Sequence, residues 1–301
     1  MKDLSVIFVN YKTKEMTADA IQSVFDKTEG VNYDIIVVDN NSKDGSVKFI
    51  KEKFDNKITL IESKENRGFG AGNNLGIKAS NAKYVFLLNT DTLLINNAIK
   101  ILFDFMELNP NVGACGGNMY ATDGKPINSV RWKLPGNKFA ITRLFAAIKL
   151  KLLKVSPGFN YSKMNKKTGS IVGADMLIRK TALDEVGMFD EDFFLYYEET
   201  ELCHRLWKNG WESYSVPEAM ITHFEGGSTI KKNDEEKSFR TFQYSEFLFF
   251  EKTKGNKAVR KHYKRKKRYY LILNILKFGT RKKAKMKCQI MDQEYQRWQR
   301  R

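Results

Sequence analysis

Two aspartates follow short apolar runs at the points where strands would end. Asp39 closes the run at residues 33–39 and opens the polar segment DNNSKDGS, and Asp91 follows the run at residues 83–89 within the segment NTDT. In an open parallel sheet, ligands bind outside the carboxyl ends of the strands, so both carboxylates stand where a ligand would bind. The alternative is that they are helix N-caps or turn residues, a common role for aspartate.

A glycine-rich segment, NRGFGAGNNLG at residues 66–76, could let the backbone approach a diphosphate, and its Arg67 supplies a cation. Neither register of the glycines gives the GxGxxG spacing, and the segment follows the third apolar run instead of the first. The chain also has no GxxxxGK(S/T) motif. These patterns argue against a dinucleotide-binding protein and against a P-loop nucleoside triphosphatase.

The elements that must position these residues alternate along the first hundred positions. Four short runs rich in β-branched residues are separated by segments long enough for crossover helices. This alternation predicts an α/β fold, with a doubly wound, mostly parallel, Rossmann-like sheet. The predicted strands are residues 4–10, 33–39, 58–62 and 83–89, and the predicted helices are residues 13–27, 45–54 and 71–80.

The second half of the chain is less regular. Residues 120–168 contain three prolines, several glycines and isolated aromatic residues, which predict an irregular insertion. Regular patterns return at residues 170–179, in a helix at residues 199–208 and in a strand-like run at residues 214–224. A helix with six aromatic residues between positions 239 and 250 follows, and we expect these rings to pack in a core.

Composition indicates a globular protein with a large core. The chain has 301 residues, 42% hydrophobic and 13% aromatic, which fits one large α/β domain with an appendage. Its three cysteines have no paired spacing, which argues against a disulfide framework or a four-cysteine zinc site and favours a reducing compartment. We expect no signal peptide and no membrane-spanning helix, because every apolar run is too short.

The net charge of +17 is concentrated near the C-terminus. Residues 251–301 hold 19 Lys and Arg against 3 Asp and Glu, so the rest of the chain is nearly neutral. Basic clusters at residues 261–268 and 281–287 flank the apolar stretch 269–278. This pattern favours a helix on an anionic membrane surface. The alternatives are a solvated basic helix and a nucleic-acid-binding tail.

Six segments occur in the order seen in one enzyme family: VDNNSKDGS, ENRGFGAGNNLGI, LLNTDT, GADMLIRK, FFLYYEETELCHRL and ITHFEGGS. Together they resemble family 2 glycosyltransferases of the GT-A fold, in particular the bacterial rhamnosyltransferase-like branch, over roughly residues 4–230. The resemblance implies a GT-A-like domain at residues 1–230, with residues 120–168 as an acceptor-side insertion. Residues 231–301 would then form a helical, strongly basic, membrane-associating extension.

The resemblance also implies which residues bind the nucleotide-sugar donor. Asp39 matches the aspartate that hydrogen-bonds the pyrimidine base, with Asn10 and Asn41 nearby. The donor would be dTDP-rhamnose or, as second choice, a UDP-hexose. Further donor contacts are expected from Arg67, Gly68, Asn73, Asn89, Thr90 and Asp91.

A divalent cation, Mn²⁺ or Mg²⁺, is implied by the same resemblance. Asn89-Thr90-Asp91 occupies the position where the family often has Asp-x-Asp, so Asp91 is the one firm carboxylate ligand. His223 matches a histidine that completes the metal site in several relatives, although a histidine after a strand can also be structural. Such a cation would stabilise the charge of a diphosphate leaving group.

An acceptor hydroxyl loses a proton as it attacks, so a carboxylate near it can act as general base. Glu198 and Glu199 match the family's Glu-Asp pair, whose second member is the base, and the glutamate at the second position leaves open which of the two acts. Glu199 shares a helix face with apolar residues three and four positions later, whereas Glu201 and Arg205 are spaced as a structural pair. The alternative is that the acids only complement the helix N-terminus.

Together these patterns predict a metal-dependent, inverting glycosyltransferase that acts on a bacterial cell-surface glycan or lipid-linked acceptor. We expect it in the cytoplasm, peripheral on the inner face of the membrane. Asp175, Arg131 and Trp132 are the candidate acceptor contacts. Two alternatives stay open: a nucleic-acid-binding protein that uses the tail, which leaves the strand-end acids unexplained, and a non-catalytic homologue, suggested by Asn89. We do not expect nucleic acid as a partner.

Overall fold

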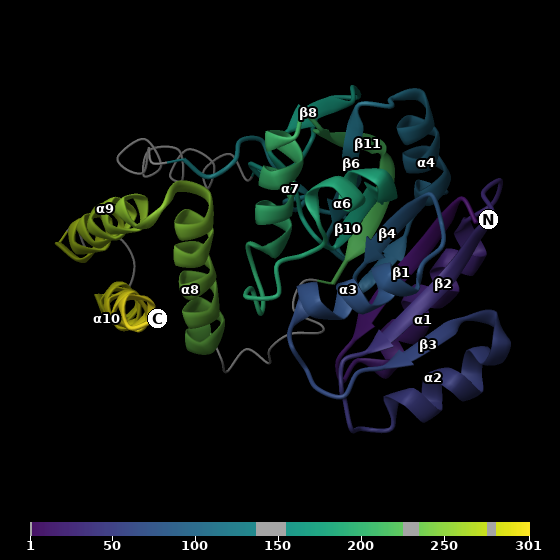
Figure 1. Ribbon diagram of the computed structural model, residues 1–301, viewed down its shortest axis with the longest axis horizontal. Coiled ribbons are helices and arrows are strands. Elements are labelled where there is room, and N and C mark those ends of the chain that lie inside the picture. The colour runs from purple at the N-terminus through teal and green to yellow at the C-terminus, as the bar shows by residue number, and fades with distance from the viewer. Residues whose placement is uncertain (1, 137–154, 225–234, 276–280) are drawn as a thin grey trace. The chain divides into compact units, whose positions relative to one another are not determined.

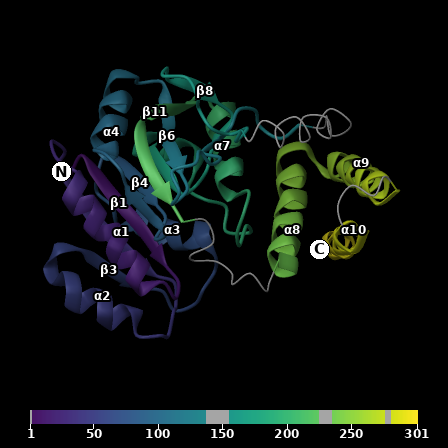
Figure 2. The same ribbon diagram turned by 180° about the vertical axis from the view of Figure 1, so that it is seen from behind.

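The computed structural model describes residues 2–136, 155–224, 235–275 and 281–301, and the chain divides into two compact units (Figure 1, Figure 2). The first, which we call the sheet unit, comprises the described residues within Met1–Leu134, Ser156–Phe194 and Glu198–Thr229. The second, which we call the helical unit, comprises those within Pro135–Val155, Leu195–Tyr197 and Ile230–Arg301.

The first four strands form the parallel half of the sheet, in the order β3-β2-β1-β4. Asn10 pairs with Asp39 in register, so β1 and β2 end side by side. All residues of β4 are buried, as expected for a parallel strand covered on both faces. The elements are β1 (Leu4–Asn10), α1 (Lys14–Lys27), β2 (Tyr33–Asp39), α2 (Ser46–Phe54), the short 3₁₀ helix η1 (Asp55–Lys57), β3 (Thr59–Glu62), α3 (Phe69–Ala79) and β4 (Tyr84–Leu88).

Residues of β1 alternate between two hydrophobic clusters, because successive side chains of a strand point to opposite faces. Val6 and Phe8 pack in one cluster with Ile21 of α1, and Ile7 packs in the other with Ile77 of α3. Helices therefore cover both faces of the sheet, which confirms the predicted doubly wound α/β architecture.

The second half of the sheet is mixed. β10 lies antiparallel between β4 and β6, β11 runs parallel to β6, and β5 and β8 pair antiparallel with β11. The pairing of β5 with β11 brings the segment after β4 beside the end of β11. The elements are β5 (Thr92–Leu94), α4 (Ala98–Leu108), β6 (Val112–Tyr120), β8 (Lys166–Thr168), β10 (Asp175–Arg179), α6 (Lys180–Val186), α7 (Glu198–Lys208) and β11 (Glu212–His223).

The ordered stretch at residues 170–179 is two strands, because the chain turns between β9 (Ser170–Ile171) and β10. β9 pairs with β7 (Val130–Arg131), a short strand within the predicted insertion. The described residues of that insertion also include β8, and its remainder, residues 137–154, lies outside the described residues.

The helical unit contains α8 (Glu235–Lys254), α9 (Asn256–Ile275) and α10 (Arg281–Gln299), so the predicted helical C-terminal region is confirmed. The aromatic rings of α8 contribute to its core: Phe247, Phe249 and Phe250 are buried, as predicted. Tyr263 of α9 stacks on Tyr295 of α10 with ring centroids 3.9 Å apart. Within the described part of the chain, no helix combines the length and apolar character needed to cross a membrane.

Candidate functional site

The ends of β1 and β2 hold a buried carboxylate in a fixed orientation. Asn10 Nδ2 donates to Asp39 Oδ1 at 2.6 Å and to Ser42 Oγ at 3.1 Å, and the Ser42 backbone N–H donates to Asp39 Oδ2 at 3.0 Å. Asp39 is 3% exposed. Asn41, between them, has a φ of 61°, so the chain turns sharply after β2. Asp39 is therefore oriented before any ligand arrives.

A second set of hydrogen bonds joins this pair to the segment after β4. Thr13 Oγ1 donates to Asn10 Oδ1 at 3.1 Å and lies 3.1 Å from Thr90 Oγ1. Thr17 Oγ1 also donates to Asn10 Oδ1, at 2.8 Å. Because β1 separates β2 from β4, Asn10 and Thr13 bridge the two strand ends. The segments that carry the two predicted aspartates therefore lie on one edge of the sheet.

Asp91 and His223 are brought together by the pairing of β5 with β11. Thr92 lies opposite His223 in the register, and the Phe224 backbone N–H donates to the Asp91 carbonyl at 2.9 Å. His223 Nε2 lies 3.2 Å from Asp91 Oδ1, and their side chains are 13% and 2% exposed. An aspartate oxygen and an imidazole nitrogen at this separation fit Mn²⁺ or Mg²⁺, with coordination positions left for phosphate oxygens.

Asp91 and His223 supply fewer ligands than a metal site made entirely of protein side chains. Among the described residues, no group of three or more His, Cys, Asp or Glu side chains could hold a metal ion together. Both backbone polar groups of Asn89 form hydrogen bonds. Its N–H donates to the Ala174 carbonyl at 3.0 Å, and its carbonyl accepts from Thr92 Oγ1 at 2.6 Å. A cation here would therefore take most of its ligands from substrate oxygens and water.

The glycines of the glycine-rich segment are explained by close packing. A Cβ added to Gly72 would lie 2.7 Å from Val9 Cγ1, and one added to Gly76 would lie 2.5 Å from Ile7 Cγ2. Gly68 has a φ of 96°, a conformation that favours glycine. These glycines allow α3 to lie directly on β1.

Arg67 and Asn73, the other residues of this segment that are predicted to contact the nucleotide sugar, interact with protein groups in the structure. Arg67 Nη1 lies 2.9 Å from Glu191 Oε2, and its side chain is 56% exposed. Asn73 is buried, and its Nδ2 donates to the Phe69 carbonyl within α3 at 3.0 Å. Arg67 is therefore accessible from solvent, whereas the Asn73 side chain donates to a carbonyl of its own helix.

The paired glutamates begin α7, and Glu198 lies beside the glycine-rich segment. A Cβ added to Gly70 would be 3.7 Å from Glu198 Cβ, and one added to Gly173 would be 3.7 Å from Glu199 Cβ. Both glutamates are buried, and Thr200 Oγ1 donates to Glu199 Oε1 at 2.8 Å. Burial and the nearby charge of Glu199 raise the pKa of the Glu198 carboxyl well above its usual value. The raised pKa favours the protonated, neutral form of Glu198.

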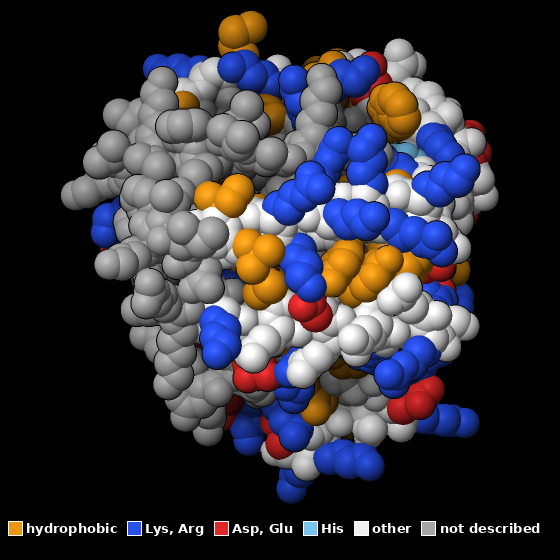
Figure 3. Space-filling model, turned by 90° about the vertical axis from the view of Figure 1, so that its left-hand side faces the viewer, with side chains coloured by type: hydrophobic (Ala, Val, Ile, Leu, Met, Phe, Trp, Pro, Cys, Tyr) orange, Lys and Arg blue, Asp and Glu red, His pale blue; other side chains and the backbone are white. Residues whose placement is uncertain are grey.

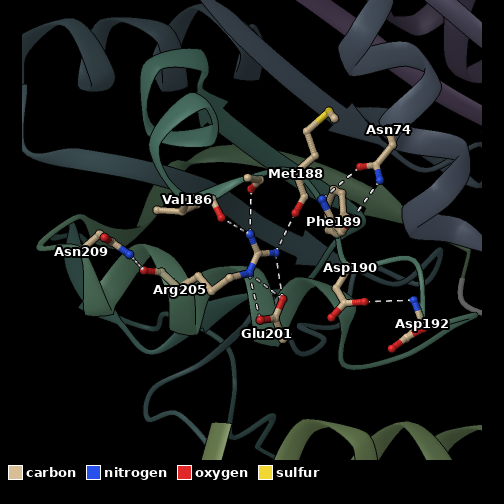
Figure 4. Close-up of polar contacts among 10 residues, drawn as sticks. Asn74, Val186, Met188, Phe189, Asp190, Asp192, Glu201, Arg205 and Asn209 are labelled. Carbon is tan, nitrogen blue, oxygen red and sulfur yellow. Dashed lines mark hydrogen bonds and ion pairs between the residues drawn. The ribbon is translucent and has the colours of Figure 1, made fainter. Parts of the chain in front are cut away.

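Figure 4 shows how the chain before the glutamates is anchored. Glu201 forms the predicted pair with Arg205 at 2.8 Å, and the same guanidinium donates to the carbonyls of Val186, Gly187 and Met188. The sequence reading missed a second anchor. Asn74 of α3 donates to the Phe189 carbonyl at 2.9 Å and accepts from its N–H at 3.0 Å (Figure 4). The adjacent asparagines in GAGNNLG were its only signal in the sequence.

The predicted acceptor residues occupy two different environments. Asp175 is fully buried, its Oδ2 accepts the Gly117 N–H at 2.7 Å, and burial raises its pKa well above the usual value. Trp132 Nε1 donates to the Pro157 carbonyl at 2.8 Å, and the Arg131 carbonyl accepts from Thr168 Oγ1 at 2.7 Å. Asp175 is thus part of the sheet interior, whereas Arg131 and Trp132 are partly exposed around β7.

Comparison with known sequences gives consistent matches over the sheet unit. The family model for glycosyl transferase family 2 matches residues 5–187, more than half of the chain. The chain is 29% identical over 209 residues to the low-salt glycan biosynthesis hexosyltransferase Agl10 of Haloferax volcanii, which covers 68% of this chain and 62% of that relative. It is 29% identical over 217 residues to the N-acetylglucosaminyl-diphospho-decaprenol L-rhamnosyltransferase of Mycobacterium tuberculosis, covering 65% and 67% of the two chains. The chain thus spans about two thirds of these relatives.

Two solved structures share the fold. One is the mannosyltransferase PcManGT from Pyrobaculum calidifontis in complex with GDP-Man and Mn²⁺, with a TM-score of 0.57 and 16% identity over 83% of this chain and 64% of that one. The other is GalNAc-T7 with UDP, GalNAc and Mn²⁺, with a TM-score of 0.59 and 14% identity over 83% and 48%. These similarities confirm the predicted GT-A-like fold.

Proposed function

Because this chain is a member of glycosyl transferase family 2, we propose that it is an inverting glycosyltransferase that uses a nucleotide-diphosphate sugar. The observation that carries the proposal is the hydrogen-bonded edge that joins Asp39 and Asn10 to Thr90, next to the Asp91–His223 pair. A nucleotide needs a polar group for its base and a cationic site for its diphosphate. Asp39 supplies the polar group for the base, and Asp91 and His223 can hold the cation for the diphosphate.

The donor is a pyrimidine nucleotide sugar, dTDP-rhamnose first and a UDP-hexose second. The Asp39 carboxylate is held by Asn10 and Ser42, so it can accept a hydrogen bond from a ring N–H without reorganisation. The name of the Mycobacterium relative, a rhamnosyltransferase, supports the first choice. Arg67, Gly68 and Asn73 are proposed as further contacts of the donor.

Asp91 and His223 would hold the divalent cation, Mn²⁺ or Mg²⁺. When bound, the ion neutralises charge that develops on the diphosphate as the glycosidic bond breaks. The two side chains lie on separate segments that β5 and β11 hold together, so their spacing does not depend on the ligand. The Mn²⁺ in both structural neighbours supports the choice of a divalent cation.

Glu199 is the general base of the proposed reaction. An acceptor hydroxyl oxygen attacks the anomeric carbon, the bond from that carbon to the diphosphate oxygen breaks, and the hydroxyl proton passes to Glu199. A base must be ionised, and the raised pKa of Glu198 favours its protonated form. A single displacement of this kind inverts the anomeric configuration.

A thermal-shift screen tests the donor assignment, since a ligand that binds only the native state raises the melting temperature. We expect dTDP-rhamnose or a UDP-hexose to raise it in the presence of MnCl₂ and much less in EDTA. GDP-mannose serves as a purine control. Equal shifts with purine and pyrimidine donors, or shifts independent of the cation, would overturn this assignment.

The acceptor is a cell-surface glycan or a lipid-linked glycan, and the chain acts from the cytoplasm on an anionic membrane surface. The exposed face of α9 supports this: its basic residues recur at helical spacing, and apolar residues of the opposite face are buried. Figure 3 shows Lys and Arg side chains gathered around hydrophobic ones on one face. Among the described side chains of α9, the exposed basic and apolar ones are Lys257, Arg260, Lys261, Lys264, Arg268, Leu271 and Ile272.

Charge reversal on α9 tests this surface. The triple variant Lys261→Glu, Lys264→Glu, Arg268→Glu should lose sedimentation with phosphatidylglycerol-containing vesicles, since each basic residue near such a surface contributes about 1 kcal/mol. Wild-type protein should not sediment with phosphatidylcholine vesicles. If the α9 variant still sediments with these vesicles, the proposal that α9 binds an anionic membrane would be refuted. The matched control reverses three exposed lysines of α2, Lys48, Lys51 and Lys53.

A further inference from the structure

Two consecutive tyrosines directly before the paired glutamates adopt left-handed backbone conformations. Tyr196 has a φ of 71° and Tyr197 a φ of 69°. Residues with side chains rarely adopt this conformation because the Cβ approaches the following carbonyl. Such strain persists only where surrounding contacts impose it, and it concentrates at functional sites. The next residue, Glu198, begins α7.

Contacts within the helical unit impose this turn. Ser245 Oγ of α8 donates to the Leu195 carbonyl at 2.8 Å, and Tyr196 Oη lies 2.8 Å from Ser238 Oγ. Tyr197 Oη donates to Glu246 Oε1 at 3.0 Å. Ser238, Ser245 and Glu246 lie on one face of α8 because their spacing follows the helical repeat. Each residue of the turn is therefore held separately.

Aromatic packing adds to these bonds. Phe242 of α8 packs against both tyrosines, with its ring centroid 5.7 Å from that of Tyr196 and 5.3 Å from that of Tyr197. Phe249, two turns further along α8, lies 5.4 Å from Tyr197. The rings are fixed as well as the hydroxyls, so neither tyrosine is free to relax its backbone.

Glu246 is the centre of a buried charged cluster. It is 3% exposed, it accepts from Gln243 Nε2 at 3.0 Å and from Lys266 Nζ, and His262 Nε2 lies 3.2 Å away. Burial opposes ionisation, but the charge of Lys266 and the bonds from His262 and Lys266 outweigh it and hold the pKa of Glu246 well below its usual value. The acceptor for Tyr197 is thus a permanent anion at neutral pH.

We infer that Glu246 and Tyr197 are positioning residues for the Glu198–Glu199 pair. Glu246 fixes the Tyr197 hydroxyl, the fixed side chain maintains the left-handed turn, and the turn orients the peptide bond that leads into Glu198. This inference rests on the proposed role of Glu199 as general base. It assigns a function in the reaction to a buried charge that lies 47 residues beyond the base in the sequence.

The test compares Tyr197→Phe with Tyr263→Phe in the full-length chain. Each variant removes one hydroxyl bond to a carboxylate in the helical unit, since Tyr263 Oη donates to Asp292 Oδ1 at 2.8 Å. We expect Tyr197→Phe to lower kcat about tenfold, the order expected for a lost bond to a charged group, with the donor KM within about twofold. Tyr263→Phe should leave kcat unchanged.

Hydrogen exchange supplies a readout that does not need activity. Amides of residues 198–202 should exchange faster in Tyr197→Phe than in wild type or Tyr263→Phe. Unchanged exchange there, or equal kcat in Tyr197→Phe and wild type, would overturn the inference. If instead Glu199→Gln retains full kcat, the proposed base is wrong, and the exchange result still decides whether the Tyr197 hydroxyl maintains the turn.

Discussion

Replacing Glu199 by glutamine removes the proposed base while keeping the size of the side chain and its bond from Thr200. A positioned general base contributes about 10²–10⁴-fold to a rate, so we expect kcat to fall by about a thousandfold. The donor KM should change little, because Asp39 and Asp91 are unaltered. The assay is transfer of labelled sugar at saturating donor over a series of acceptor concentrations.

Glu198→Gln is the matched comparison, because burial and the charge of Glu199 raise the pKa of Glu198 and so favour its neutral, protonated form. A neutral glutamine resembles that form, so kcat should stay within about threefold of wild type. If Glu198→Gln abolishes transfer while Glu199→Gln retains it, the assignment of the base is reversed.

The same pair predicts a pH dependence of stability. A carboxyl whose pKa is raised on folding binds its proton more tightly in the folded state, so its contribution to stability is full below the unfolded value of about 4.3 and is lost as the pH rises through the folded value. Wild-type protein should therefore lose free energy of unfolding over this window relative to Glu198→Gln. Urea midpoints that run parallel from pH 4 to pH 9 would contradict the buried, protonated state.

Three further changes test other parts of the structure. Asp91→Ala should abolish cation-dependent transfer while the melting temperature without ligand stays within a few degrees, and full activity of this variant in EDTA would refute the metal role. Gly72→Ala should lower the free energy of unfolding by about 1–3 kcal/mol because its Cβ meets β1 at 2.7 Å, whereas Gly136→Ala, with open space around it, should be neutral in urea denaturation. Glu246→Gln should cost about 3–5 kcal/mol because Lys266 is left buried without its anion, and a change below 1 kcal/mol would contradict the buried pair.

The parallel half of the fold was predictable because its signals are local. Continuous β-branched runs gave β1 and β2 with the bounds that the structure has, and α1 begins one residue after its predicted start. The mixed half depends on which distant segments pair. Nothing local in residues 170–179 indicates that they divide into β9 and β10, or that β10 lies antiparallel between β4 and β6.

In the candidate site, too, some residues could be identified from the local sequence and others could not. Asp39 and Asp91 could be identified as strand-end carboxylates from their neighbours in the sequence. The bridge through Thr13, the Asn74 clamp and the Tyr197–Glu246 contact could not, because each joins residues whose proximity exists only after folding. The glycines of α3 were open to two interpretations, and the close approach of Gly72 and Gly76 to β1 shows that packing requires these two.

The central claim is that a donor diphosphate and its cation bind beside Asp91 and His223. Pulsed EPR of Mn²⁺ bound to the full-length chain with dTDP tests it most directly, since the ion reports the nuclei of its own ligands. We predict a nitrogen coupling from one histidine together with phosphorus couplings, and loss of the nitrogen coupling in His223→Ala. Phosphorus couplings without any histidine nitrogen in the wild-type chain would contradict this site.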